Sequence, residues 1–207
     1  MNCIEFADNI AVDLQSRMSD LPEGFYDTFR FTQTGNNYTH PITLALLSSI
    51  LWHTPGVTRV GIDHRLNLGN KVKFQPDLTG LDADFRPLAF IDYESPNSSD
   101  SRLPEKDVDA YVAWRRKSRS LSVPYVIVTT LPNRRTEDWE LRYASPGYYN
   151  HAFQGRESEI RQNPYCFWYD GYYLKEFSNR DMKNIVLINI DGKVVKRVYP
   201  AQDERKT

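Results

Sequence analysis

The spacing of apolar residues predicts two helices in the N-terminal part of the chain. Residues 4–18 place apolar side chains three and four positions apart, which is typical of one face of an amphipathic helix. The residues on this face are Ile4, Ala7, Ile10, Ala11, Leu14 and Met18. The Gly-Asn-Asn segment at 35–37 predicts a turn. A second, largely apolar helix is expected to begin at Pro41 and to end before Pro55 and Gly56.

The pattern then changes to that of short strands. Residues 57–64 alternate between apolar and polar side chains, and residues 73–80 form a second short segment that ends in glycine. The third segment, 87–94 (PLAFIDYE), is a compact apolar run with acidic residues at its end. The connection between the second and third segments has the length of a hairpin loop. These three segments therefore predict neighbouring strands.

A helix and a buried strand are predicted next. The helix follows Pro104 and carries Val108, Tyr111, Val112 and Arg115 along one face. Residues 122–132 (SVPYVIVTTLP) are almost continuously apolar, which is typical of a strand covered on both faces. Residues 184–199 predict a hairpin of two alternating strands joined by Asp191-Gly192. Between these elements, 132–164 are polar and aromatic, and a short helix near 156–162 is all that their pattern suggests.

The order helix, three strands, helix, strand predicts an α/β protein. We expect a mixed central sheet flanked by helices, extended by the C-terminal hairpin. A chain of 207 residues has the length of one ordinary domain, so we expect a single domain with its core at about 43–131.

Composition and charge narrow the functional classes. A net charge of −1 excludes a uniformly basic, histone-like binder but leaves room for a local basic strip that contacts nucleic acid. The two cysteines, Cys3 and Cys166, form no CxxC pair, which argues against a zinc site or a disulfide framework. No apolar run approaches the roughly 20 residues that span a bilayer, and the N-terminus is too acidic for a signal peptide. We therefore expect a soluble, cytoplasmic protein without a membrane partner.

Three acidic residues carry the candidate chemistry. Asp77 lies on the second predicted strand, while Asp92 and Glu94 are two apart on the third and therefore point to one face. If these strands pair, Asp77 approaches Asp92, and their hard oxygen ligands suit Mg²⁺ or Mn²⁺. Such an ion can activate water and stabilise charge on a phosphodiester. Asp77 alone also fits an ordinary Pro-Asp turn, whereas Asp92 follows an apolar run and needs a metal or another partner there.

These residues also carry a resemblance to a known family. Pro76-Asp77, followed by an apolar strand that ends in Asp92-Tyr93-Glu94, resembles the signature of PD-(D/E)xK nucleases over about 43–131. Within that superfamily, IDYESPNSSD followed by Lys106 and Tyr111 is similar to the Uma2-type branch. The resemblance implies a restriction-endonuclease-like fold, an endonuclease that hydrolyses DNA with Mg²⁺ or Mn²⁺, and a homodimer.

The chain departs from this signature at one position, because Glu94 stands where the family usually has lysine. Glu94 could be a third metal ligand or a catalytic base, and Lys106 could supply the positive charge from the following helix. Both alternatives stay open. In some branches the helix before the first strand adds a glutamate or histidine, and His53 is the candidate here.

A basic run offers a surface for the substrate. Arg115, Arg116, Lys117 and Arg119 either contact phosphates or simply complement the carboxyl end of their helix. The aromatic run at 165–173 (YCFWYDGYY) is more typical of a core or an interface than of a platform for stacked bases. Two further functions stay open: a catalytically inactive nuclease fold that binds nucleic acid or a protein, and an enzyme that acts on a nucleotide or RNA.

Overall fold

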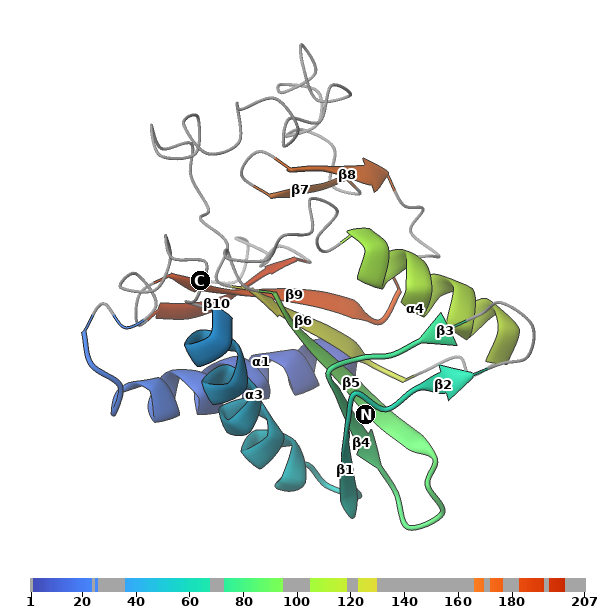
Figure 1. The fold of residues 1–207 in the computed structure, drawn as a ribbon, viewed down its shortest axis with the longest axis horizontal. Helices are drawn as coiled ribbons and strands as arrows, with labels where there is room; N and C mark the ends of the chain where they lie inside the picture. Colours follow the sequence, from blue (N-terminus) through green and yellow to red (C-terminus); the bar gives the residue numbers. More distant parts are fainter. Residues whose placement is uncertain are drawn as a thin grey trace.

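A computed structural model gives the fold of the chain (Figure 1). The described residues are 2–23, 25, 36–67, 73–94, 105–118, 123–129, 166–169, 172–176, 183–191 and 194–199. They contain the helices α1 (Cys3–Met18), α3 (Asn36–Trp52) and α4 (Glu105–Ser118). None of these helices is long and apolar enough to cross a membrane.

Six strands form one mixed sheet in the order β1-β4-β5-β6-β9-β10 (Figure 1). Their bounds are β1 Arg59–Ile62, β4 Leu78–Leu81, β5 Pro87–Glu94, β6 Tyr125–Thr129, β9 Ile185–Asp191 and β10 Val194–Tyr199. Strands β1, β4 and β5 are antiparallel neighbours, β5, β6 and β9 are parallel, and β10 returns antiparallel to β9. The chain is therefore an α/β protein, and the C-terminal hairpin extends the sheet as predicted.

Two small hairpins lie outside this sheet. One pairs β2 (Leu66–Asn67) with β3 (Lys73–Phe74), and the other pairs β7 (Cys166–Tyr169) with β8 (Tyr172–Glu176). The second falls in the aromatic run at 165–173, where the structure describes the backbone but not the side chains. Residues 130–165, which include the predicted short helix near 156–162, lie outside the described part.

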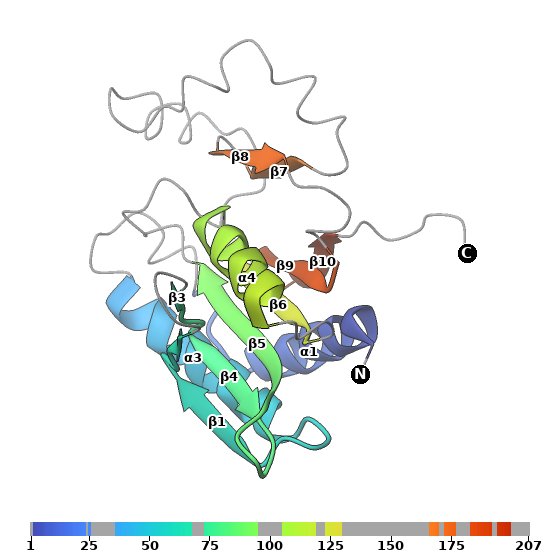
Figure 2. The same ribbon diagram turned by 90° about the vertical axis from the view of Figure 1, so that its right-hand side faces the viewer.

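Helices cover both faces of the sheet (Figure 2). On one face, Ala89, Ile91 and Tyr93 of β5 join the core formed with α1 and α3. On the other face, Phe90 packs edge-on against Trp114 of α4 with 5.0 Å between ring centroids. Because alternate residues of a strand point to opposite faces, Asp92 and Glu94 belong to the α4 face together with Phe90.

The packing of α1 follows its predicted face with one exchange. Phe6 is buried, whereas Ile4 is 40% exposed. Asn2 begins the helix, and its side chain accepts a hydrogen bond from the backbone N–H of Ile4. Asp8 forms an ion pair with Arg197 of β10, with 2.8 Å between Oδ1 and Nε. This contact fixes α1 to the edge of the sheet.

Two predicted boundaries were wrong. The helix α3 begins at Asn36, not at Pro41, so the predicted turn at 36–37 is helical. Pro41 is the sixth residue of α3 and has no N–H, so one backbone hydrogen bond of the helix, to the carbonyl oxygen of Asn37, cannot form. The segment 73–80 is not one strand but β3 and β4, because Pro76 has no N–H to donate to a ladder.

Beneath α4 lies an aromatic cluster that forms a second core. Its members are Phe74, Phe90, Tyr111, Trp114 and Tyr125. The hydroxyl of Tyr111 donates to the carbonyl oxygen of Val123 at 2.7 Å. Burial raises the pKa of Tyr111 to about 12. Tyr111 thus packs α4 against the sheet.

Candidate metal and active site

The hairpin of β4 and β5 brings Asp77 opposite Asp92. Leu78 pairs with Ile91, so the residue before Leu78 faces the residue after Ile91. The backbone N–H of Asp77 donates to Oδ1 of Asp92 at 2.5 Å, and the backbone N–H of Tyr93 donates to Oδ2 of Asp77 at 2.8 Å. Each aspartate is therefore held by the backbone of the opposite strand.

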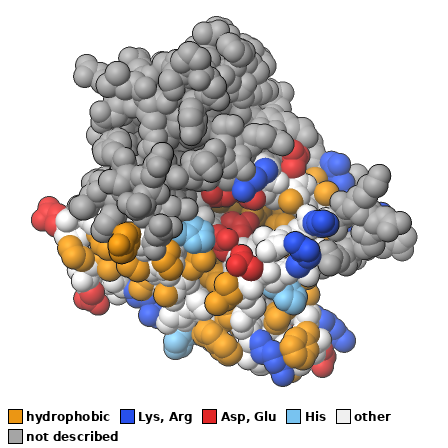
Figure 3. All heavy atoms as spheres, in the orientation of Figure 1, with side chains coloured by type: hydrophobic (Ala, Val, Ile, Leu, Met, Phe, Trp, Pro, Cys, Tyr) orange, Lys and Arg blue, Asp and Glu red, His pale blue; other side chains and the backbone are white. Residues whose placement is uncertain are grey.

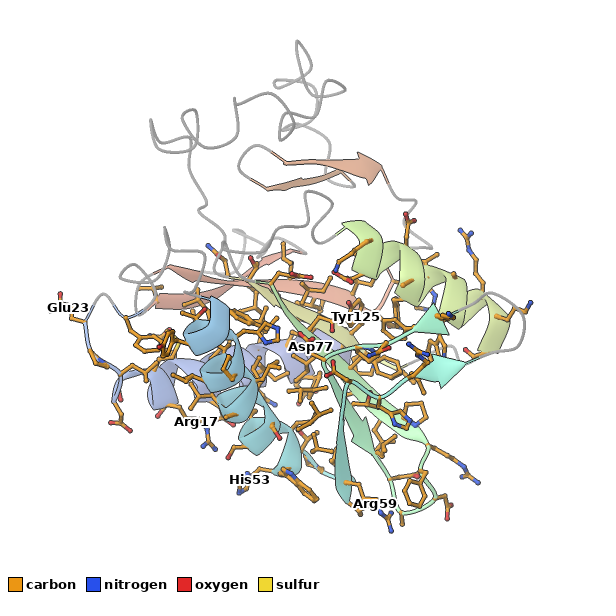
Figure 4. All side chains as sticks on the ribbon, in the orientation of Figure 1. Arg17, Glu23, His53, Arg59, Asp77 and Tyr125 are labelled. Atoms are coloured by element: carbon orange, nitrogen blue, oxygen red, sulfur yellow. The ribbon has the colours of Figure 1, made fainter. Side chains whose placement is uncertain are left out.

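A tyrosine on the next strand holds the other oxygen of Asp92. Tyr125 lies on β6, which runs parallel to β5, and its hydroxyl donates to Oδ2 of Asp92. Asp92 is 6% exposed and Tyr125 is fully buried. Figure 4 shows Asp77 and Tyr125 close together at the centre of the molecule, between α3 and α4. Asp92 is thus anchored from both neighbouring strands.

The first turn of α4 adds charged residues at the end of β5. Glu94 is the last residue of β5, is 9% exposed, and shares a side-chain hydrogen bond with Asp107. Nζ of Lys106 lies 3.9 Å from Oδ1 of Asp107. The resulting group, Asp77, Asp92, Glu94 and Asp107, is called the carboxylate cluster below.

Burial and crowding of like charge shape the electrostatics of the carboxylate cluster. Burial raises the pKa of Asp92 well above its usual range, and the charges of Asp77 and Asp107 raise it further. Burial likewise raises the pKa of Glu94, with added contributions from Asp107 and Asp92, while Lys106 acts in the opposite direction. Both carboxyls therefore favour the neutral form, and a cation bound beside them would favour the charged form.

The donor set of the cluster suits a hard divalent cation in its chemistry and its charge. Each carboxylate oxygen has two lone pairs, so the oxygens of Asp92 that accept protein hydrogen bonds keep acceptor capacity. Within the described ranges, however, no three His, Cys, Asp or Glu side chains are arranged as a ready metal site. The residues fit Mg²⁺ or Mn²⁺ by type, and side chains of the cluster would have to rotate to share one ion.

A histidine that the sequence did not single out lies beside the cluster. Nε2 of His40 is 3.7 Å from Oδ2 of Asp77, and its ring contacts Tyr93 with centroids 5.6 Å apart. His53, the candidate from the sequence, lies just past the other end of α3, where its Nδ1 bonds with the carbonyl oxygen of Ser49 (Figure 4). His40 therefore lies beside Asp77, whereas His53 lies at the other end of α3.

The basic residues of α4 separate into two groups. Arg115 is 7% exposed, and its Nη1 donates to the carbonyl oxygen of Lys183 at 2.5 Å. This burial contradicts its predicted role at phosphates, because its charge is used inside the fold. Arg116 and Lys117 are exposed, and Arg119 lies outside the described residues.

Charged side chains are unevenly distributed over the face that Figure 3 shows. Acidic side chains gather near the middle of the described surface, with basic side chains on one side of them and a histidine on another.

Comparisons with models of protein families, with curated proteins and with solved structures found no match.

The crowding of charge predicts that the cluster weakens the fold. Since the pKa of Asp92 is raised in the folded state, its protonation stabilises the fold at low pH, and this contribution is lost as pH rises through the raised pKa. We expect Asp92→Asn to raise the melting temperature at pH 8 in EDTA, by about 2–4 °C for each kcal/mol recovered. The gain should shrink toward acidic pH.

The control for this melting experiment is Asp84→Asn, at the exposed turn between β4 and β5. Scanning calorimetry at pH 5 and pH 8 measures both variants against the parent. A parent that melts at the same temperature as Asp92→Asn at pH 8 would contradict the electrostatic account.

Proposed function

We propose that this chain is a divalent-metal-dependent endonuclease that hydrolyses phosphodiester bonds in DNA. The observation that carries the proposal is the pairing of Asp77 with Asp92 across β4 and β5, in a buried cluster of like charge. Perturbed carboxylates that crowd one another are typical of functional sites, because they weaken the fold unless a ligand relieves them.

Each residue has an assigned role in this proposal. Asp77 and Asp92 are metal ligands, and Glu94 is either a third ligand or the base that takes a proton from water. Lys106 stabilises negative charge on the phosphate from the first turn of α4. A bound Mg²⁺ or Mn²⁺ would activate water and stabilise the extra charge of the phosphodiester in the transition state.

The arrangement of elements supports the restriction-endonuclease-like fold as part of the proposal. A helix precedes three antiparallel strands, and a second helix leads to a parallel strand beside the third. This is the order that the resemblance to PD-(D/E)xK nucleases implies. A single domain, a homodimer and a cytoplasmic location belong to the same proposal.

An alternative is an inactive nuclease fold that binds nucleic acid or a protein partner. Two observations favour it: Glu94 replaces the usual lysine, and no metal-binding group of three side chains is present in the part of the chain that the structure describes. The deciding experiment incubates the purified chain with supercoiled DNA and with RNA in Mg²⁺, Mn²⁺ or EDTA. Metal-dependent nicking of DNA supports the nuclease, cleavage of RNA alone changes the substrate, and binding without cleavage supports the alternative.

The exposed basic residues of α4 predict a salt-dependent contact with DNA. If Arg116 and Lys117 meet phosphates, replacing both with alanine should flatten the plot of log affinity against log salt by about one unit for each contact. Fluorescence anisotropy of a labelled duplex between low and moderate salt measures this slope. Adding Arg119→Ala tests the third residue.

A matched control removes two exposed arginines elsewhere, with Arg59→Ala and Arg86→Ala. Its slope should equal that of the parent, because both arginines make their contacts at the β4–β5 turn and not on α4. If both double variants share the parent's slope, the basic residues of α4 serve only to complement the end of their helix.

A further inference from the structure

A groove of about 630 Å³ lies between α1 and the carboxyl end of α3. The two helices pack against each other, and the groove follows the exposed stripe of α1 beside that contact. His40 and His53 are 13 positions apart on and just beyond α3, which corresponds to about 20 Å along a helix. The groove is therefore remote from the carboxylate cluster, and a ligand bound in it would not contact the proposed nuclease site.

The groove has an apolar floor and a polar rim. Phe6, Ile10 and Ile50 form its floor and are buried. The rim is formed by exposed side chains that include Glu5, Asn9, Asp13 and His53. Such a combination suits a ligand with an apolar body and a few polar groups.

The charges around the groove are negative. Glu5, Asn9 and Asp13 follow one another at intervals of four on α1, so the two carboxylates are about 12 Å apart along the helix with an amide between them. Among the described residues that line the groove there is no Lys or Arg. Arg17, four positions after Asp13 on α1, is not part of this lining.

The carboxyl end of α3 adds negative electrostatic potential to the groove. A helix carries partial negative charge at its carboxyl end, and α3 has no basic residue in its last turn. The positive amino end of α1 is already compensated, because Asn2 caps it and Glu5 lies in its first turn. The groove is thus suited to a cation at two separate points.

We propose that this groove binds a linear polyamine. One ammonium group lies at Glu5 and another at Asp13, the Asn9 carbonyl accepts from an amine between them, and the methylene segments cover Phe6 and Ile10. A compact cation such as Mg²⁺ cannot contact both carboxylates at this separation or cover the apolar floor. An anion finds no lysine or arginine in the groove.

Titration calorimetry with spermidine at constant ionic strength tests this proposal. We expect the double variant Glu5→Gln/Asp13→Asn to bind at least about tenfold more weakly than the parent, since both charge contacts are lost. Putrescine should also bind at least tenfold more weakly, because its shorter chain cannot reach both acids. The control Glu23→Gln/Asp84→Asn removes two exposed acids outside the groove and should bind spermidine as the parent does.

A second variant makes the test independent of the lost acids. Asn9→Lys places an ammonium group four residues from both Glu5 and Asp13, where it forms pairs within the helix and occupies the groove. It should abolish spermidine binding while the circular dichroism spectrum and melting temperature stay those of a folded chain. Equal affinity in the parent and the Glu5/Asp13 variant overturns the proposal, as does binding of a lysine-rich peptide without binding of spermidine.

Discussion

Replacing Asp92 or Asp77 with asparagine is expected to abolish metal-dependent cleavage while the chain stays folded. Asparagine keeps the size of the side chain and an acceptor oxygen, but it removes the charge that a divalent cation requires. Titration calorimetry with Mn²⁺ should show binding in the parent and its loss in both variants. Cleavage should fall by more than about a hundredfold, the scale expected for the loss of a direct contact at an active site.

The alanine variants are a harsher form of the same test. Asp92→Ala leaves the buried hydroxyl of Tyr125 and the backbone N–H of Asp77 without their acceptor. An unsatisfied buried group costs about 1–3 kcal/mol, so alanine at this position should also lower the melting temperature. The asparagine variant separates loss of charge from loss of structure.

A control at the other end of the same hairpin completes this experiment. Asp84→Asn removes one acidic charge from the exposed β4–β5 turn and should leave both Mn²⁺ binding and cleavage unchanged. If either Asp77→Asn or Asp92→Asn retains the parental affinity for Mn²⁺, that residue is not a ligand. A parent that releases no heat with Mn²⁺ would favour the inactive nuclease fold.

Much of the fold could be predicted because the apolar pattern was strong. Strand β5 has the predicted bounds, since its apolar run is closed by proline at one end and by acidic residues at the other. The four residues predicted along one face of α4 are all buried: Val108, Tyr111, Val112 and Arg115. In both elements, burial on the sheet agreed with the local pattern.

The boundary errors came from local signals that tertiary contacts overrode. Proline marks the first turn of many helices, but α3 begins at Asn36, several residues before Pro41. The strands β2 and β3 have two residues each, which is too short for alternation to reveal. The sequence led to two incompatible predictions for Arg115, a place on the buried face of α4 and a contact with DNA. Arg115 is buried, and its guanidinium donates to the carbonyl oxygen of Lys183.

Only part of the candidate site was visible in the sequence. The approach of Asp77 to Asp92 followed from the hairpin, because a short loop fixes which strands pair. Tyr125 was missed because its contact with Asp92 depends on the register of the parallel strands β5 and β6. Asp107 was missed because its distance from Glu94, at the end of β5, depends on how α4 packs against the sheet. His40 was missed because the helix was predicted to begin only at Pro41, whereas α3 begins at Asn36.

The cleavage rate is expected to depend strongly on which residue supplies positive charge to the proposed active site. Glu94 belongs to the carboxylate cluster, and Lys106 lies beside it, with its Nζ 3.9 Å from Oδ1 of Asp107. The charge of Lys106 opposes the rise that burial causes in the pKa of Glu94. If Lys106 stabilises the transition state, Lys106→Ala should reduce the single-turnover rate by about a hundredfold or more. Lys106→Arg, which keeps the charge, should then retain more of the rate than alanine does.

If Glu94 is itself a ligand or base, the two variants should show the opposite pattern of cleavage rates. Glu94→Lys should then abolish cleavage and weaken Mn²⁺ binding, while Lys106→Ala has little effect. If Lys106 supplies the positive charge that a lysine supplies in PD-(D/E)xK nucleases, Glu94→Lys should be tolerated or even raise the rate, because it restores that charge on β5. The Ser95-Pro96 step and Tyr111 resemble the Uma2-type pattern, in which the lysine is on the helix, so we favour Lys106. Single-turnover rates at saturating Mn²⁺ decide between them, and parental rates in both variants would leave only Asp77 and Asp92 in the proposed site.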